Sequence, residues 1–125
     1  MGIAIISTDK GDFTFQSTDD AIKFIQTAAQ ENNDIWISGE LPYPCIAVTI
    51  NGEYAAINFF QDDTGRVWLS YNDKNQKEVT FIAGGEVWKP DVEAIITLND
   101  AFSCIREFLD TYERPTYIQW QKLWC

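Results

Sequence analysis

The sequence predicts an α+β fold: a mainly antiparallel β-sheet with two helices packed on one face, forming a single two-layer domain over residues 1–125. Two segments have the apolar spacing of amphipathic helices. Several short strands lie between them, joined by turn signals that favour antiparallel pairing. The length of 125 residues and the hydrophobic content of 46% fit one globular domain with its own core.

A short strand over residues 3–6 is followed by the first helix. Ser17 is a suitable N-cap, and Asp19 and Asp20 would lie in the first turn, where the helix dipole favours acidic side chains. Asn32-Asn33 is expected to end the helix. The apolar residues that recur at helical spacing are Ala21, Ile22, Ile25, Ala28 and Ala29.

A run of strands follows this helix. Pro42 and Pro44 break the chain between the first two strands. Asn51-Gly52 is a strong hairpin signal, because both central residues of a type I′ turn need a positive φ. A second turn is predicted at residues 62–65, and Gly84-Gly85 ends a further strand. The predicted strands are residues 35–38, 45–50, 53–60, 66–71 and 78–83, with residues 86–89 extending the sheet.

Alternation along these strands assigns their side chains to two faces. The face toward the helices is predicted to hold Ile46, Val48, Ile50, Ala55, Ile57, Phe59, Val67, Leu69 and Tyr71. The opposite face is predicted to hold Tyr54, Asn58, Phe60, Trp68 and Ser70. This second set mixes aromatic and small polar residues, which is typical of a binding face. A partly covered sheet face, or a different strand register, explains the pattern equally well.

The second helix is predicted to begin at Thr97, because residues 97–100 resemble a capping box with Asp in place of Glu. Pro115 excludes further helix, and residues 116–121 alternate as a last strand. The predicted buried face of this helix is Ala101, Phe102, Ile105, Phe108 and Leu109.

The chain is strongly acidic, with nineteen acidic residues, nine basic ones and a formal net charge of −10. Residues 1–63 carry ten acids and two bases, a net charge of −8, whereas residues 64–125 carry nine acids and seven bases, a net charge of −2. Such a surface is repelled by nucleic acid and by anionic lipid, and it attracts basic proteins. Solubility alone is the simpler explanation, and the charge by itself favours it.

The same composition favours a cytoplasmic protein. No apolar run approaches the ~20 residues of a membrane span, and the first residues lack the pattern of a signal peptide. Three widely spaced cysteines, Cys45, Cys104 and Cys125, argue against a disulfide framework or a zinc site and suit a reducing compartment.

Catalytic chemistry is not indicated. The chain has no histidine, so it has neither a Ser-His-Asp nor a Cys-His arrangement and no imidazole metal ligand. Asp19-Asp20 and Asp62-Asp63 are more simply a helix start and a hairpin turn than an acid/base pair and a cation site. Arg114 suits a salt bridge better than a phosphate contact. We predict no enzyme, no catalytic residue, no metal and no cofactor.

Several motifs between Tyr54 and Gln121 resemble, in their order and spacing, the Imm1 family of bacterial immunity proteins of contact-dependent inhibition and other polymorphic toxin systems. They are the strand YAAINFF, the turn DDTG, Trp68, the strand EVTF, Gly84-Gly85, Pro90, Leu98, Ala101, Glu107-Phe108-Leu109, Arg114-Pro115 and Trp120. The family's final segment runs Thr-Gly-x-Arg-Pro and then a strand with Trp. Thr111, Arg114, Pro115 and Trp120 fit it, whereas Tyr112 stands where glycine is usual.

The resemblance implies a cytosolic antitoxin. It would bind the C-terminal domain of a cognate toxin, a nuclease or nucleic-acid deaminase, and cover its basic active site or substrate groove. The matched residues are interpreted as fold determinants. Residues 1–53 lie outside the resemblance and hold most of the negative charge.

Toxin contacts are therefore predicted among exposed acids and aromatic anchors. The acids are Asp12, Asp19, Asp20, Asp34, Glu40, Asp62 and Asp63, and the anchors are Trp36, Tyr43, Tyr54 and Trp68. Two alternatives stay open: a small carboxylate-based enzyme, and a general acidic adaptor or DNA-mimic protein. A monomer and a weak dimer fit the sequence equally.

Overall fold

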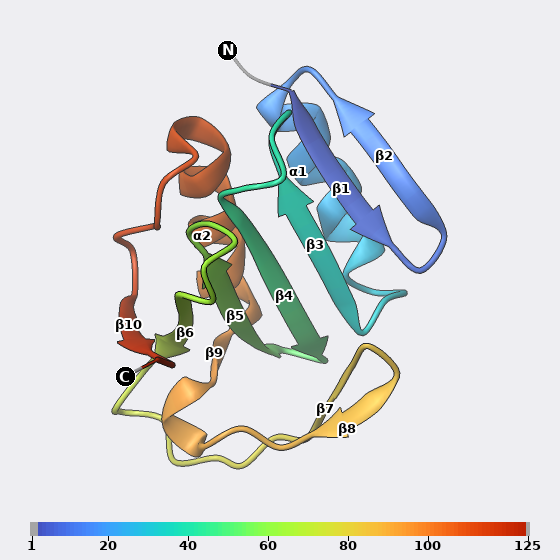
Figure 1. The fold of residues 1–125 in the computed structure, drawn as a ribbon. Helices are drawn as coiled ribbons and strands as arrows, with labels where there is room; N and C mark the ends of the chain where they lie inside the picture. Colours follow the sequence, from blue (N-terminus) through green and yellow to red (C-terminus); the bar gives the residue numbers. More distant parts are fainter. Residues whose placement is uncertain (1–2, 125) are drawn as a thin grey trace.

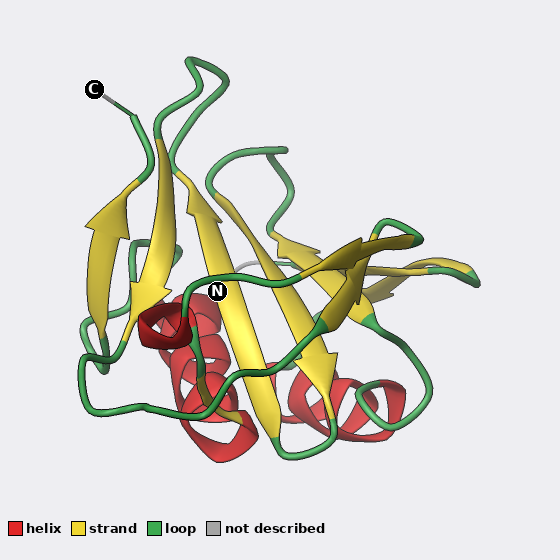
Figure 2. Ribbon diagram, turned by 90° about the horizontal axis from the view of Figure 1, so that it is seen from below, coloured by secondary structure: helices red, strands yellow, loops and turns green. Residues whose placement is uncertain are grey.

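Two helices cover one face of an antiparallel β-sheet in the computed structural model, which describes residues 3–124 (Figure 1). The helices are α1 (Thr18–Ala28) and α2 (Leu98–Thr111), and Figure 2 shows them side by side against the sheet. The strands, in spatial order, are β10 (Gln119–Lys122), β6 (Val67–Tyr71), β5 (Tyr54–Phe60), β4 (Cys45–Asn51), β3 (Asp34–Ser38), β1 (Ala4–Thr8) and β2 (Gly11–Phe15), with β9 (Ile96–Thr97) paired to β5. All of these pairs are antiparallel, so the predicted α+β class is confirmed.

Both helix starts follow the capping rules. The Ser17 side chain accepts a hydrogen bond from the Asp20 amide at 3.3 Å, and Thr97 does the same for Asp100 at 3.1 Å. Helix α1 ends earlier than its Asn-Asn signal, but the Asn32 side chain reaches back and donates to the Ala28 carbonyl at 2.8 Å. The stop signal therefore acts through the side chain of Asn32.

The buried stripe of α1 is the predicted one, and all five of its residues lie in the core. In α2 the prediction needs one change. Cys104 is fully buried, whereas Phe102 is only partly buried at the edge of the core. The core between helices and sheet centres on Ile25 of α1 and Phe108 of α2, packed against residues from β1, β3, β4 and β5.

Residues 11–15, for which the sequence predicts no strand, form β2 and pair with β1 at the edge of the sheet. Gly11 has a φ of +121° and lets the chain reverse after β1. Strand β2 is mostly exposed, so it lacks the buried apolar alternation that makes a strand recognisable from sequence.

The predicted turn between β4 and β5 is present, but it is centred one residue later. Asn51 pairs with Tyr54, so the loop residues are Gly52 and Glu53. Gly52 has a φ of +61°, whereas Glu53 has no positive φ. A positive φ at the first central residue only is the pattern of a type II′ turn, which places glycine there.

The register of β6 differs from the prediction. Trp68 lies opposite Phe59, which faces the helices, while Val67 and Leu69 lie opposite Phe60 and Asn58 on the other face. Directly opposed residues share a face of the sheet. A register shift of one residue therefore moves every side chain of β6 to the face opposite to the predicted one. Tyr71 lies on the same face as Val67 and Leu69, because side chains two residues apart in a strand point the same way. Its predicted position on the face toward the helices is therefore also wrong.

Ser70 was predicted on the open face, but it is fully buried. Its Oγ accepts a hydrogen bond from the Ile57 amide at 3.0 Å and donates one to the Ala94 carbonyl at 2.6 Å. The side chain thereby bridges β5 to the short 3₁₀ helix η1 (Val92–Ala94).

The face opposite the helices, here called the outer face, is partly covered. Strands β7 (Phe81–Ala83) and β8 (Glu86–Trp88) form a separate two-stranded hairpin, not the predicted extension of the sheet. Phe81 and Trp88 pack over the outer face together with Tyr54. The residues of this second core are Ala56, Val79, Phe81 and Ile95.

Several connections gather at one end of the sheet, the upper end in Figure 1. The β3–β4 loop, the β5–β6 turn, the start of α1 and the end of α2 all lie there, because β3 and α2 run toward this end and α1 runs away from it. In residues 3–124, neither helix is long and apolar enough to cross a membrane.

Candidate functional site

A groove of about 450 Å³ separates the β7–β8 hairpin from the open part of the outer face. We call it the outer groove. Its floor comes from β3, β4 and β5, and its wall comes from the hairpin. The lining residues are Asp34, Trp36, Ala47, Thr49, Asn58, Phe60, Ala83, Gly84, Glu86, Val87 and Trp88.

The floor is a row of side chains across neighbouring strands. Trp36 lies opposite Ala47, and Ala47 lies opposite Asn58, so the three share the outer face. The small Ala47 leaves room for the indole of Trp36 to stack on Phe60, with ring centroids 5.2 Å apart and planes at 25°. Trp36 keeps 43% of its surface exposed, so it presents aromatic surface to the groove.

The wall is fastened to the floor by an acidic side chain. Oδ2 of Asp34 accepts a hydrogen bond from the Gly84 amide at 3.0 Å, between β3 and the tip of the hairpin. Asn51 donates to the Thr80 carbonyl at 2.7 Å and fixes the base of the hairpin. Glu86 pairs with Ala83 across the hairpin and lies on the side that lines the groove.

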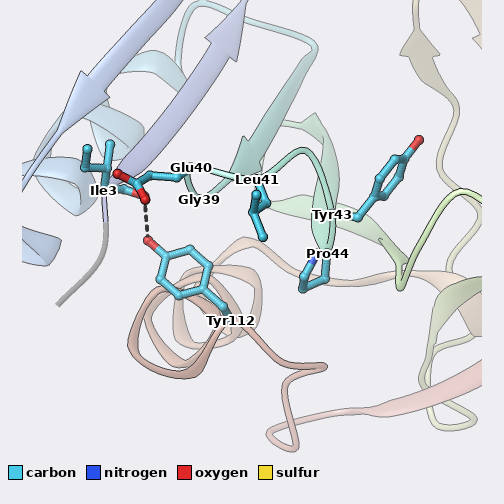
Figure 3. Close-up of a pocket in the computed structure, with 7 residues that line it drawn as sticks. All are labelled: Ile3, Gly39, Glu40, Leu41, Tyr43, Pro44 and Tyr112. Carbon is cyan, nitrogen blue, oxygen red and sulfur yellow. Dashed lines mark hydrogen bonds between the residues drawn. The ribbon is translucent and has the colours of Figure 1, made fainter.

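A second hollow, of about 230 Å³, lies at the gathered end of the sheet (Figure 3). We call it the end socket. Ile3, Gly39, Glu40, Leu41, Tyr43, Pro44 and Tyr112 line it. Leu41 is 71% exposed and Tyr43 38%, so the β3–β4 loop presents apolar side chains to solvent. Glu40 supplies the single carboxylate among the lining residues.

Tyr112, which stands where the resembled family has glycine, forms the inner wall of this socket. It is the left-handed cap of α2, with a φ of 53° and a ψ of 35°. Its hydroxyl donates to the Ile3 carbonyl at 2.9 Å, and its ring meets Phe108 edge-on at 5.4 Å. These contacts offset the conformational cost of the left-handed cap, which is about 1 kcal/mol for a residue with a Cβ.

The sequence-predicted contact residues fall into separate groups. Asp34 and Trp36 line the outer groove, and Glu40 and Tyr43 line the end socket. Asp19 and Asp20 lie in the first turn of α1, and Asp62 and Asp63 lie in the β5–β6 turn. Asp12 lies on β2, the strand at the far edge of the sheet.

Two predicted anchors have packing roles. Tyr54 packs against the second core, and the ammonium group of Lys77 lies 4.9 Å from its ring centre. Trp68 packs against the main core between Arg114, whose guanidinium lies 3.8 Å from its ring, and Trp124. Arg114 therefore stacks on an aromatic ring, where the sequence suggested a salt bridge.

Besides Asp34, two of the predicted acids have intramolecular partners. Asp19 forms an exposed salt bridge to Arg106 of α2 at 3.2 Å. The hydroxyl and the amide of Thr64 donate to Asp62, and these hydrogen bonds lower the pKa of its carboxyl. Asp62 thus stabilises the β5–β6 turn and stays ionised near neutral pH.

The groove also contains three residues of the hairpin that the sequence did not single out, Glu86, Val87 and Trp88. Asn58 and Phe60 of β5 lie on the outer face, as the sequence predicted, and both line the groove. Val87 is 74% exposed, an unusual position for a β-branched apolar residue in a strand. Leu41 was likewise missed, although its place in a loop between Glu40 and Pro42 is a local signal of exposure.

The thiols in the described part of the chain are buried and unpaired with one another. Burial raises the pKa of Cys45, and burial with the nearby Glu107 and Asp100 carboxylates raises the pKa of Cys104 to about 12. Cys125 lies outside the described residues. Among residues 3–124, no three His, Cys, Asp or Glu side chains gather as a metal site would require.

No protein-family model matches the chain, and no curated protein matches it either. The outer groove and the end socket are therefore interpreted from their own chemistry.

Proposed function

We propose that the protein is an immunity protein that binds and neutralises a cognate bacterial toxin domain. The resemblance of residues 54–121 to the Imm1 family motivates the proposal, and the charge of −10 agrees with a basic partner. The toxin domain is proposed to be a nuclease or nucleic-acid deaminase, because enzymes of both kinds need a basic surface to hold their substrate.

One observation carries the proposal. Four of the seven large apolar side chains that are exposed in residues 3–124 line the outer groove or the end socket, and both hollows contain carboxylates and no lysine or arginine. The four are Trp36, Leu41, Tyr43 and Val87. Apolar anchors surrounded by charge of one sign are the composition of an interface for a partner of opposite charge.

The two kinds of residue would act at different stages of binding. The acids at the gathered end, such as Glu40 and Asp63, would speed the encounter with a basic surface. Leu41, Tyr43 and Trp36 would then become desolvated and hold the complex together. Inhibition follows because the inhibitor covers the basic surface that the toxin needs for its substrate.

The proposal predicts that the gene directly upstream encodes the toxin, and the test is co-expression with that toxin domain, followed by growth measurement and purification of the complex. Rescue of growth together with a stoichiometric complex supports the proposal. A toxin that still kills, or that does not co-purify, contradicts it. Binding to several unrelated basic proteins, lost steeply as salt rises, would instead identify a general acidic adaptor.

Leucine variants make the test specific to the site. Leu41→Ala removes a 71%-exposed side chain from the end socket, and Leu123→Ala removes a 53%-exposed leucine beyond β10. Because both residues are exposed, both variants should fold. We expect Leu41→Ala alone to weaken the complex, about tenfold or more. Equal effects of the two variants would argue against the socket as a contact.

A further inference from the structure

We propose that the outer groove receives an arginine side chain of the protein partner. The inference rests on the proposed function only in taking the toxin domain as the source of that arginine. The argument uses the charge of the groove, its aromatic surface and its size.

The outer groove is negatively charged, which favours a cationic ligand. Asp34 belongs to the floor, on β3, and Glu86 belongs to the wall, on β8, so the floor and the wall each contribute a carboxylate. No lysine or arginine is among the lining residues, so no basic side chain of the lining neutralises them. Asp34 uses Oδ2 to hold Gly84 and is only partly buried, so its other carboxylate oxygen can accept a hydrogen bond from a ligand.

The aromatic lining selects the kind of cation. Trp36 is 43% exposed and Trp88 half-buried, and both indoles line the groove. A guanidinium is planar, stacks on aromatic faces and can bond a carboxylate through two N–H groups at once. An ammonium is more strongly hydrated and lacks the planar face, so it fits this lining less well.

The same chain already contains such a contact. The guanidinium of Arg114 lies 3.8 Å from the ring of Trp68, within the packed C-terminal region. The outer groove presents aromatic surface of the same kind, with two carboxylates in addition and no cation among its lining residues. At about 450 Å³ it has room for an arginine side chain and part of the backbone on either side.

The floor also provides a neutral polar contact. The side chain of Asn58 lies on the outer face beside Ala47, and its oxygen can accept N–H donors. A guanidinium has five N–H donors and no acceptor, so the Asn58 oxygen together with the two carboxylates matches it.

The test is a titration of the protein with the blocked tripeptide Gly-Arg-Gly, followed by the indole N–H signals of the five tryptophans in a two-dimensional NMR spectrum. The matched probe is Gly-citrulline-Gly, which has nearly the same shape and no charge. We expect the arginine peptide to shift the signals of Trp36 and Trp88, and the citrulline peptide to shift them at least tenfold less at equal concentration. A lysine peptide should bind several-fold more weakly than the arginine peptide.

Charge variants locate the site. Asp34→Asn keeps an oxygen for the Gly84 amide while removing the charge, and Glu86→Gln removes the second charge. Each should weaken arginine binding at least threefold. Asp110→Asn is the control, because it removes the same charge from an exposed position on α2, on the opposite side of the sheet.

The inference is overturned if arginine and citrulline peptides shift the signals equally, if Trp36 and Trp88 do not respond, if lysine binds as well as arginine, or if Asp110→Asn acts like the groove variants. A protein that binds its toxin but not the arginine peptide keeps the proposed function and overturns this inference. A protein that binds the arginine peptide but not the toxin supports the groove as an arginine site and overturns the proposed function.

Discussion

Gly39 lies directly against the ring of Tyr112: a Cβ atom at position 39 would stand 2.8 Å from Cε1 of that ring. The β3–β4 loop and the end of α2 are therefore fitted to each other at the end socket. The absence of a side chain at position 39 makes room for a tyrosine at a helix cap where a glycine would be the unstrained choice.

This contact predicts that Gly39→Ala displaces Tyr112 and destabilises the protein by about 1–3 kcal/mol, the usual cost of overpacking. Chemical denaturation measures it. The double variant Gly39→Ala/Tyr112→Gly has no tyrosine ring for the alanine to meet. Its free energy of unfolding should therefore be nearly the same as that of Tyr112→Gly alone. An alanine that costs the same in both backgrounds would contradict the packing argument.

Ser70→Ala should destabilise the protein by about 2–4 kcal/mol. It would leave the Ile57 amide and the Ala94 carbonyl without their buried hydrogen-bond partner, and each unsatisfied group costs about 1–3 kcal/mol. Ser103→Ala, on the exposed surface of α2, is the matched control and should change stability by less than about 0.5 kcal/mol. Similar midpoints in urea for the two variants would refute the bridging role.

Trp36→Ala should affect binding far more than folding. The side chain is 43% exposed and stacks on Phe60 alone among the described aromatic rings, so we expect a stability loss near 1 kcal/mol. Affinity for the toxin domain should fall by about tenfold to a hundredfold if the indole anchors the interface. Calorimetry of complex formation measures this, and an affinity within twofold of the wild type would remove Trp36 from the interface.

Replacing Asp62 and Asp63 with Asn should slow association with the toxin domain more than it changes dissociation. The association rates of the variant and the wild type should become equal at high salt, because salt screens the exposed charges. Asn at position 62 keeps an oxygen that can cap the Thr64 amide, so the turn is preserved. Asp73→Asn/Asp91→Asn is the control pair, with equal charge change on other exposed loops. An unchanged on-rate at low salt in stopped-flow measurements would exclude Asp62 and Asp63 from steering.

The buried thiol of Cys104 predicts a loss of stability in alkali. Burial, together with the nearby Glu107 and Asp100 carboxylates, raises the pKa of this thiol from its ordinary value of 9.0 to about 12, so the folded state binds the proton more tightly than the unfolded chain. The stability that this raised pKa contributes to the folded protein is complete below pH 9, and it is lost as the pH rises toward 12. Burial also raises the pKa of Tyr112, which acts in the same direction. Denaturation between pH 8 and pH 11 should show a smaller decline for Cys104→Ala, and an identical slope would contradict the assignment.

The sequence predicted well those features that depend on neighbouring residues. The caps at Ser17 and Thr97 and the apolar stripe of α1 depend on spacing within one helix, and they are confirmed. The errors lie where strands meet. The face of Trp68 depends on how the β5–β6 turn sets the register against Phe59, and one residue of shift reverses every side chain.

The candidate site was predictable only in part for the same reason. Asp34 and Trp36 lie two residues apart on β3, share one face of the strand and line the groove, as residues predicted to contact a partner could do. The wall of the groove comes from a hairpin about fifty residues later, and the Gly84 amide joins that hairpin to Asp34. Tyr54 and Trp68 had the same aromatic character as Trp36, yet distant segments cover them. An aromatic residue on a strand is apolar enough to be buried by another segment or to bind a partner. Which of the two happens depends on tertiary contacts that the local sequence does not show.

Within residues 3–124, the sheet ends in two edge strands that no further strand pairs, β2 and β10. Unpaired edges are templates for aggregation, because another strand can add to their free amide and carbonyl groups. Both edges are short, five and four residues, and each contains a charged side chain, Asp12 on β2 and Lys122 on β10. A second molecule that approached edge to edge would also meet a like charge of −10. The acidity that would suit the proposed basic partner therefore also protects the free protein from polymerising with itself.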